Sequence, residues 1–246
     1  MKILLAPAKK MNMDTDTLPP EGLPQFLPQT ERLLTALQSM SEKELQTLWK
    51  CSGKIAQLNI ERLKTMDLRQ SLTPALLSYE GIQYRYMAPG VMEVCQLEYL
   101  RKHLRILSGF YGLLRPFDGV TPYRLEMQAK LAVAGAKDLY AFWGDRLAKQ
   151  LEGDWVLNLA SKEYSKAVTP YLSENSMLTC VFGEWLNGKV VEKGTMCKMA
   201  RGQMVRWLAE NNIETPEEIC EFADLEYGFD TELSTENTYV FIKGGR

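Results

Sequence analysis

Short apolar runs separated by segments of helical periodicity constrain the fold of this chain most. Residues 3–6, 155–159 and 239–242 are almost entirely apolar over the length of a strand, which is typical of strands buried on both faces. Between the first two runs, four leucines recur at helical spacing: Leu97, Leu100, Leu104 and Leu107. They predict an amphipathic helix over about 91–107. Interleaved strands and helices predict an α/β (mixed α+β) fold with a central mixed sheet.

The first quarter of the chain combines a proline-rich stretch with a set of expected helices. Residues 14–28 contain four prolines, which predict an extended surface loop. Ser41 and Glu44 form a capping-box pattern at the start of a helix. The helix expected after it is marked by three apolar residues: Ile55, Leu58 and Leu63. We therefore expect a packed helical subregion over about 30–64.

Further elements are expected in the second half of the chain. Asp138 can cap a helix over 138–151, and helical periodicity returns over 196–209. Apolar and polar residues alternate over 181–192 around Asn187-Gly188, a strong short-range signal for a β-hairpin. Because no repeat, low-complexity tract or linker is visible, we expect a single domain over residues 1–246.

The pattern of cysteines and histidines favours a protein without a metal centre that resides in a reducing compartment. The five cysteines are scattered without a C-x-x-C pair: Cys51, Cys95, Cys180, Cys197 and Cys220. A histidine-based site would have to depend on His103, the one histidine of the sequence. We predict no metal, no cofactor and a cytoplasmic location. The sequence contains no run of about eighteen apolar residues, so no membrane span is predicted. The apolar run at the N-terminus is too short for the core of a signal peptide.

The charge of the chain is unevenly distributed. The net charge is −2, but residues 207–246 hold ten acids and two bases, so this stretch carries −8 and residues 1–206 carry +6. A basic body with an acidic tail can bind an anion although the overall pI is below neutral. Ordinary solvated surface is the alternative interpretation of the same charges.

Three clusters of polar residues are candidates for a site, and the first lies around two glycines. Gly109 and Gly112 follow the helix expected over 91–107 and suit a tight hairpin between helices, since glycine permits positive φ and close backbone approach. Together with Ser108, such a turn presents N–H groups that can cradle a phosphate. The bases near it in sequence are Arg101, Lys102, Arg105, Arg115 and Arg124. A helix cap followed by a core-packed aromatic turn is the alternative.

The second cluster follows the strand expected over 155–159. Ligands of α/β folds favour the carboxyl ends of strands. Asn158 can orient a ligand there, Ser161 can cap the next helix, and Lys162 or Lys166 can meet an anion. An ordinary strand-to-helix loop is the alternative.

The third cluster lies on the helix expected over 196–209. Lys198 and Arg201 are three residues apart and therefore share a helix face. Gly202 permits a close backbone contact beside them. Lys9, directly after the first strand, adds a positive charge if that strand is central. On spacing alone, a solvated helix face is the alternative.

These segments, in this order, resemble the YaaA family. The matching motifs are Ala6-Pro7-Ala8-Lys9, Leu107-Ser108-Gly109-Phe110-Tyr111-Gly112-Leu113-Leu114-Arg115-Pro116, Pro122-Tyr123-Arg124-Leu125-Glu126-Met127, Phe142-Trp143-Gly144, Asn158-Leu159-Ala160-Ser161 with Glu163-Tyr164 and Lys166, and Ala200-Arg201-Gly202. The resemblance runs from residue 3 to about 206 and is loose in the acidic C-terminal stretch. The chain has Ala6 where serine is common in the family, and Lys10 where threonine is common.

The resemblance implies a role in peroxide defence linked to limiting free intracellular iron. It also implies DNA binding, a basic cleft and a helix-hairpin-helix-like element, which we place at residues 108–112. We expect the protein to contact mainly the phosphates of duplex or structured DNA, with weak sequence preference and steep salt dependence. We expect the chain to be a monomer. We expect one cleft to gather six cations: Lys9, Arg124, Lys162, Lys166, Lys198 and Arg201.

Two other functions stay open. The cleft can belong to an enzyme acting on a nucleotide or nucleobase, with Asn158 and Tyr164 orienting the substrate. Glu163 or Glu126 would then be its acid–base group. No nucleophile–base pattern is recognisable, so the catalytic residues are unassigned. A plain interaction module is the third interpretation.

Overall fold

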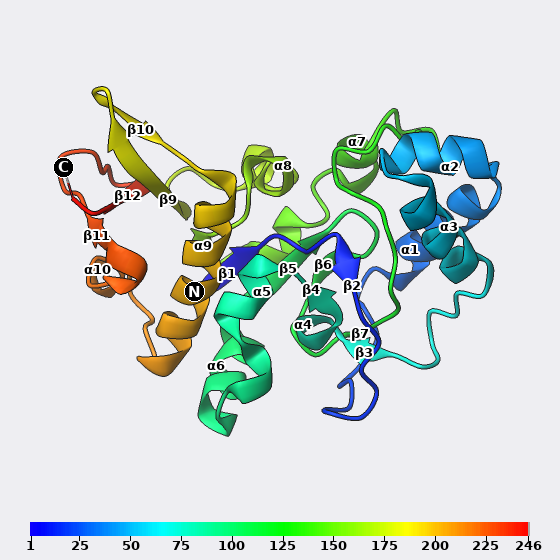
Figure 1. Ribbon diagram of the computed structural model, residues 1–246, viewed down its shortest axis with the longest axis horizontal. Coiled ribbons are helices and arrows are strands. Elements are labelled where there is room, and N and C mark those ends of the chain that lie inside the picture. The colour runs from blue at the N-terminus through cyan, green and yellow to red at the C-terminus, as the bar shows by residue number, and fades with distance from the viewer. Residues whose placement is uncertain (246) are drawn as a thin grey trace.

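The computed structural model describes residues 1–245, and Arg246, one of the two bases counted in the acidic tail, lies outside it. The largest sheet among the described residues contains eight strands: β1 (Lys2–Leu5), β5 (Leu104–Ser108), β6 (Gly112–Leu114), β8 (Val156–Asn158), β9 (Met177–Leu186), β10 (Lys189–Val191), β11 (Tyr227–Phe229) and β12 (Thr238–Lys243). Their order is β11-β12-β9-β8-β1-β5-β6, and β10 pairs with β9 (Figure 1). The mixed α/β fold with a mixed sheet is thereby confirmed.

The centre of the sheet is parallel and its outer pairs are antiparallel. The neighbours β12, β9, β8, β1 and β5 run parallel, whereas β6, β10 and β11 each pair antiparallel. β1 lies between β5 and β8, and its Ile3, Leu4 and Leu5 are fully buried. Coverage on both faces explains why this run is continuously apolar. Because parallel strands end at the same edge, the loops after β1 and β8 lie side by side.

Helices pack around the sheet, and two small ribbons link its loops. These helices are α4 (Ala75–Ser78), α5 (Ile82–Met87), α6 (Val94–His103), α7 (Leu139–Trp143), α8 (Lys162–Ser165), α9 (Gly194–Glu210) and α10 (Pro216–Ile219). The ribbons pair β2 (Lys10–Met11) with β4 (Tyr79–Glu80), and β3 (Thr73–Pro74) with β7 (Gly119–Val120). Single 3-10 turns cover Pro89–Val91, Ala148–Leu151, Thr169–Tyr171 and Asp224–Glu226. Within residues 1–245, no helix combines the length and hydropathy needed to cross a membrane.

The expected helical subregion is confirmed. It consists of α1 (Leu27–Gln38), α2 (Glu42–Trp49) and α3 (Gly53–Lys64), which stand at one end of the molecule, away from the sheet (Figure 1). The capping box of Ser41 and Glu44 is present at the start of α2. The expected apolar face of α3 is wrong in part, since Ile55 and Leu58 are 42% and 48% exposed while Leu63 is buried.

Several elements are confirmed close to their expected positions. β8 and β12 form at two of the apolar runs, and α9 covers the helix expected over 196–209. β9 and β10 form the expected hairpin, with positive φ at both Asn187 and Gly188. The backbone N–H of Ala141 donates to the Asp138 carboxylate at 2.8 Å, so the predicted cap of α7 is also present.

Two expected helices are shorter than predicted. α6 ends at His103, and Leu104 begins β5, where Leu104 and Leu107 are fully buried beside β1. The leucine spacing therefore continues across a helix and a strand. The helix expected over 138–151 ends at Trp143, because Gly144 has a φ of +53° and turns the chain before a 3-10 segment.

Candidate functional site

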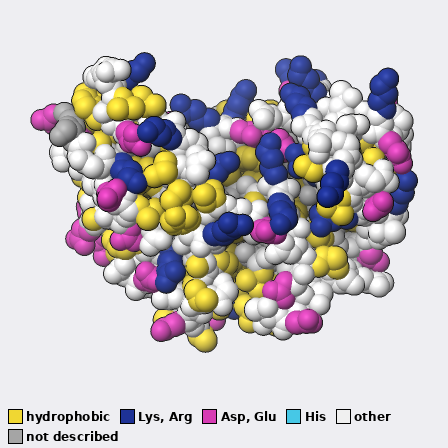
Figure 2. All heavy atoms as spheres, in the orientation of Figure 1, with side chains coloured by type: hydrophobic (Ala, Val, Ile, Leu, Met, Phe, Trp, Pro, Cys, Tyr) yellow, Lys and Arg dark blue, Asp and Glu magenta, His cyan; other side chains and the backbone are white. Residues whose placement is uncertain are grey.

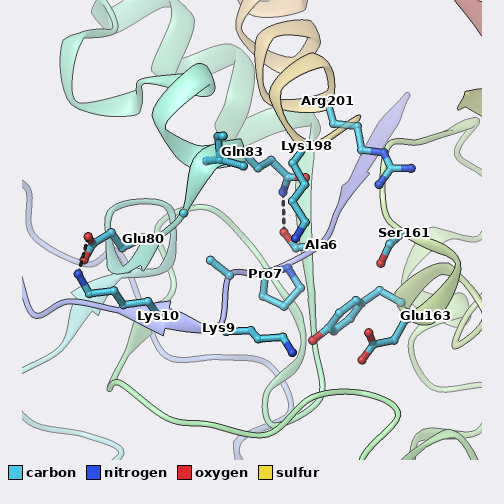
Figure 3. Close-up of a pocket in the computed structure, with 14 residues that line it drawn as sticks. Ala6, Pro7, Lys9, Lys10, Glu80, Gln83, Ser161, Glu163, Lys198 and Arg201 are labelled. Atoms are coloured by element: carbon cyan, nitrogen blue, oxygen red, sulfur yellow. Dashed lines mark hydrogen bonds and ion pairs between the residues drawn. The ribbon is translucent and has the colours of Figure 1, made fainter. Parts of the chain in front are cut away.

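Four chain segments enclose a cavity of about 360 Å³ at the carboxyl edge of the parallel strands. The loop after β1 contributes residues 6–10, and the junction of β4 and α5 contributes residues 80–83. The N-terminal part of α8 and its cap contribute Ser161, Glu163 and Tyr164, and α9 contributes Lys198 and Arg201 (Figure 3). We call this cavity the cationic pocket. Its position agrees with the preference of ligands for the carboxyl ends of strands in α/β folds.

α9 brings two cations into the pocket from one helix face. It is held against α5 at Gly202, where an added Cβ would overlap the carbonyl oxygen of Gln83, so the predicted close backbone contact is confirmed. The Arg201 side chain is only 13% exposed, and the nearest carboxylate, that of Glu192, is 3.5 Å from its Nη2. Arg201 Nε is buried and has no hydrogen-bond partner among residues 1–245. A buried guanidinium N–H without a partner is costly, and an anion would satisfy it.

The loop after β1 is fixed by hydrogen bonds to α5. The carbonyl oxygen of Ala6 accepts from Gln83 Nε2 at 2.8 Å and from the Tyr84 hydroxyl at 3.1 Å. Beyond this anchor, Lys9 pairs with Glu126 at 2.9 Å and Lys10 pairs with Glu80 at 2.6 Å. Both lysines line the pocket, but each is already matched by a carboxylate.

α8 forms the opposite wall of the pocket. Asn158, at the end of β8, accepts from Ala160 N at 3.0 Å and donates to the Thr179 hydroxyl at 3.2 Å, which fixes the loop that leads into α8. Ser161 is the N-cap residue of α8, but its hydroxyl makes no capping hydrogen bond to the described chain. It is therefore available to a molecule in the pocket, which it lines.

Glu163 is the carboxyl group of the pocket whose pKa is shifted. Its carboxylate accepts from Gln128 N at 3.3 Å. Burial raises the pKa of this carboxyl above its ordinary value, and the nearby charge of Glu126 raises it further, while Lys9 acts in the opposite direction. A half-buried carboxyl with a raised pKa can give or take a proton nearer to neutral pH than an exposed one.

The other expected cleft cations divide into two groups. Arg124 adjoins the pocket, because it forms an ion pair at 3.3 Å with Glu126, which also binds Lys9. The Nε atom of Arg124 is buried and has no hydrogen-bond partner among residues 1–245. Lys162 and Lys166 do not line the pocket, and Lys166 sits over the ring of Tyr140 at 5.0 Å. Thus Lys9, Lys198 and Arg201 share one pocket, Arg124 adjoins it and the α8 lysines stand outside it.

The placement of a helix-hairpin-helix-like element at residues 108–112 is wrong. This segment is the turn between the antiparallel strands β5 and β6, and Ser108, Phe110 and Tyr111 are buried. The N–H groups of Phe110 and Tyr111 donate to the Ser108 hydroxyl at 3.2 and 2.8 Å, so they are not offered to a phosphate. A Cβ on Gly109 would lie 2.6 Å from the Leu125 carbonyl oxygen. Gly112 likewise has a φ of +79° and packs against Trp143.

The bases that flank this turn in sequence lie away from the cationic pocket. Arg101 binds Glu21 and packs over the ring of Phe117, and Arg115 binds the buried Asp118 at 2.9 Å; both arginines line a separate cavity of about 190 Å³. Two more bases are held by other groups of the chain. Lys102 binds Glu214 at 2.6 Å, and Arg105 donates to the carbonyl oxygen of Leu104 at 2.6 Å.

Sequence reasoning missed the contribution of the segment around α5. Glu80 and Gln83 line the pocket, yet neither lies in a segment with a periodic or motif signal. In the part of the chain that the structure describes, no three His, Cys, Asp or Glu side chains are grouped as metal ligands would be.

Comparison with known proteins places the chain in a family. The family described as peroxide stress protein YaaA matches residues 1–233. A UPF0246 protein of Lachnoclostridium phytofermentans is 53% identical over 247 residues, covering 99% of this chain and 97% of the relative. UPF0246 proteins of Pediococcus pentosaceus and Lactiplantibacillus plantarum are 52% and 53% identical, with at least 98% of each chain covered. The chain therefore belongs to the YaaA family of peroxide stress proteins.

Proposed function

We propose that this protein acts in the peroxide response by binding DNA through phosphate contacts in and around the cationic pocket. The observation that carries the proposal is the convergence of Lys9, from the loop after β1, with Lys198 and Arg201, from the distant helix α9. Arg201 keeps a buried N–H without a partner among residues 1–245. Phosphate oxygens are natural acceptors for guanidinium and ammonium donors.

The distribution of cations on one face of the molecule favours a long polyanion as the partner. Figure 2 shows Lys and Arg side chains gathered along the upper part and centre of the face seen there. Duplex DNA carries about one negative charge per 1.7 Å of its axis, so it can meet cations spread over such a face. Contacts of this kind position DNA without reading its sequence, in line with weak sequence preference.

The helix pair α2 and α3 is a candidate for a second DNA contact. The two helices are joined by residues 50–52 and therefore have the helix–turn–helix connectivity that the turn at residues 108–112 lacks. Lys43, Lys50 and Lys130 line a cavity of about 560 Å³ beside this pair. None of the three has an ion-pair partner within the described residues, so all can face phosphates.

DNA binding of this kind offers a physical route to limiting iron-dependent damage. A protein that neutralises phosphates with lysine and arginine releases the cations condensed on the DNA. Iron(II) held at phosphates would be among the released ions, and peroxide would then react with it farther from the DNA. The role requires no iron site on the protein itself.

Duplex affinity measured by fluorescence anisotropy across a salt series tests the proposal. We expect the affinity to depend steeply on salt. The magnitude of the negative slope of log K against log salt should decrease by about one unit in Lys198→Ala and by about one unit in Arg201→Ala. Lys102→Ala is the matched control, because Lys102 is paired with Glu214 and does not line the pocket. Thermal melts establish that each variant is folded. Wild-type affinity and slope in folded pocket variants would overturn the proposal.

A further inference from the structure

The floor of the cationic pocket limits what can enter it. Ala6, Gln83 and Tyr164 line the pocket and are each less than a tenth exposed. A continuous nucleic acid strand can cross the mouth of such a pocket, but it has no exit through the floor. A chemical group that reaches the inner pocket must therefore be small, or must be the end of a larger molecule.

The charges inside the pocket indicate the charge of that group. Lys9 and Lys10 are paired with Glu126 and Glu80 at 2.9 and 2.6 Å, whereas Arg201 meets Glu192 only at 3.5 Å and Lys198 has no ion pair within the described residues. Lys198 and Arg201 are therefore the cations of the pocket that are most open to a ligand. Arg201 Nε is buried without a partner among the described residues. Two available cations match a phosphomonoester, which carries about −1.5 to −2 near pH 7, better than a phosphodiester of the DNA backbone with its single charge.

The opposite end of the pocket suits hydroxyl groups. In Figure 3, Glu163 and Lys9 lie at the end away from Arg201, and Ser161 lies between Arg201 and Glu163. The Ser161 hydroxyl makes no capping bond to the described chain. The Glu163 carboxylate accepts from a backbone N–H and has further lone pairs to accept from a sugar hydroxyl.

We infer that the cationic pocket is a site for a phosphomonoester, with the phosphate on Lys198 and Arg201 and the attached sugar near Ser161 and Glu163, where the free hydroxyls of a nucleotide or sugar phosphate can bind. The phosphate belongs either to the end of a nucleic acid strand or to a free nucleotide or sugar phosphate. The inference rests on the proposed DNA binding and deepens it. Radical attack on deoxyribose breaks a strand and leaves phosphate ends, so a site for such ends suits a protein of the peroxide response.

The experiment compares DNA that differs only in its ends. The probes are one labelled duplex with 5′-phosphate, 3′-phosphate or hydroxyl ends, and a dumbbell of the same sequence closed at both ends. We expect a phosphate end to bind about tenfold or more tightly than a hydroxyl end, because it adds charge-assisted hydrogen bonds to two cations. Adenosine 5′-monophosphate and ribose 5-phosphate, added as competitors, are expected to remove this preference, whereas adenosine is not.

Variants connect the preference to the pocket. Arg201→Gln and Lys198→Met should each abolish the preference for a phosphate end, while the dumbbell binds more weakly but measurably, and Lys102→Ala should keep the preference. Equal affinity for phosphate and hydroxyl ends would overturn the inference, and a bound dumbbell would then leave the proposed backbone binding intact. Binding of phosphate ends or free phosphomonoesters without binding of the dumbbell would support the inference and overturn the proposed binding to backbone phosphates.

Discussion

Replacing Gly202 with alanine should loosen the packing that carries the pocket cations. Gly202 lies in α9 one residue after Arg201, and it packs against the backbone of α5. An added Cβ would overlap the carbonyl oxygen of Gln83 and would lie 2.9 Å from its carbonyl carbon and 3.1 Å from Met87 N. Backbone atoms cannot rotate away as a flexible side chain can, so α9 must move away from α5.

The size of the effect follows from two opposing terms. Overpacking costs about 1–3 kcal/mol, and a clash with backbone belongs at the upper end, near 3 kcal/mol. Alanine is about 1 kcal/mol more favourable than glycine inside a helix, which offsets part of this cost. The free energy of unfolding is therefore expected to decrease by about 2 kcal/mol. For a chain of this length, that loss lowers Tm by about 4–8 °C.

The assay is a thermal melt of Gly202→Ala beside Gly194→Ala, together with duplex affinity for both. Gly194 is in the same helix, and a Cβ there would meet nothing within 4 Å, so its alanine variant should melt at or slightly above the wild-type temperature. Gly202→Ala should also bind DNA more weakly, because its displaced helix carries Lys198 and Arg201. Equal melting temperatures for the two variants would refute the packing argument.

Three other expectations concern stability. Gly109→Val should lower Tm by several degrees, since its Cβ would press on the Leu125 carbonyl oxygen, and a soluble variant with wild-type Tm would contradict this. Arg115→Ala leaves Asp118 buried without its cation, so denaturant unfolding should show a stability loss while the salt slope of DNA binding stays unchanged. The raised pKa of Glu163 means that the folded state binds this proton more tightly than the unfolded state, so its stabilising contribution is present at low pH and lost as pH rises through the folded pKa. Glu163→Gln should therefore raise Tm at about pH 7 but much less at about pH 4, and equal shifts at both pH values would argue against the assignment.

The strands were predictable because a strand buried on both faces has a continuous run of apolar residues in the sequence. Residues 3–6 and 239–242 are continuously apolar, and the strands they form, β1 and β12, each have a neighbouring strand on both sides. The helix over 91–107 was overextended for a related reason. Leu104 and Leu107 continue the helical spacing, but their burial comes from pairing beside β1, a long-range contact that local periodicity does not encode.

The candidate site was predictable where a motif falls at the end of an element. Ser161 follows β8, and Arg201 with Gly202 marks the face of α9 that meets α5. Proximity in sequence was a poor guide to the rest. Arg101 and Arg115 flank a glycine turn, yet that turn is buried and both side chains line a different cavity. Gln83 reaches the pocket only because α5 packs beneath α9, which no local pattern indicates.

A crystal structure of the protein with a short duplex that carries a 5′-phosphate tests the central claim most directly. The cationic pocket is expected to hold a phosphate whose oxygens lie about 2.7–3.2 Å from Arg201 Nε and Lys198 Nζ. An empty pocket, with the DNA phosphates bound instead at the cavity of Arg101 and Arg115, would contradict the claim.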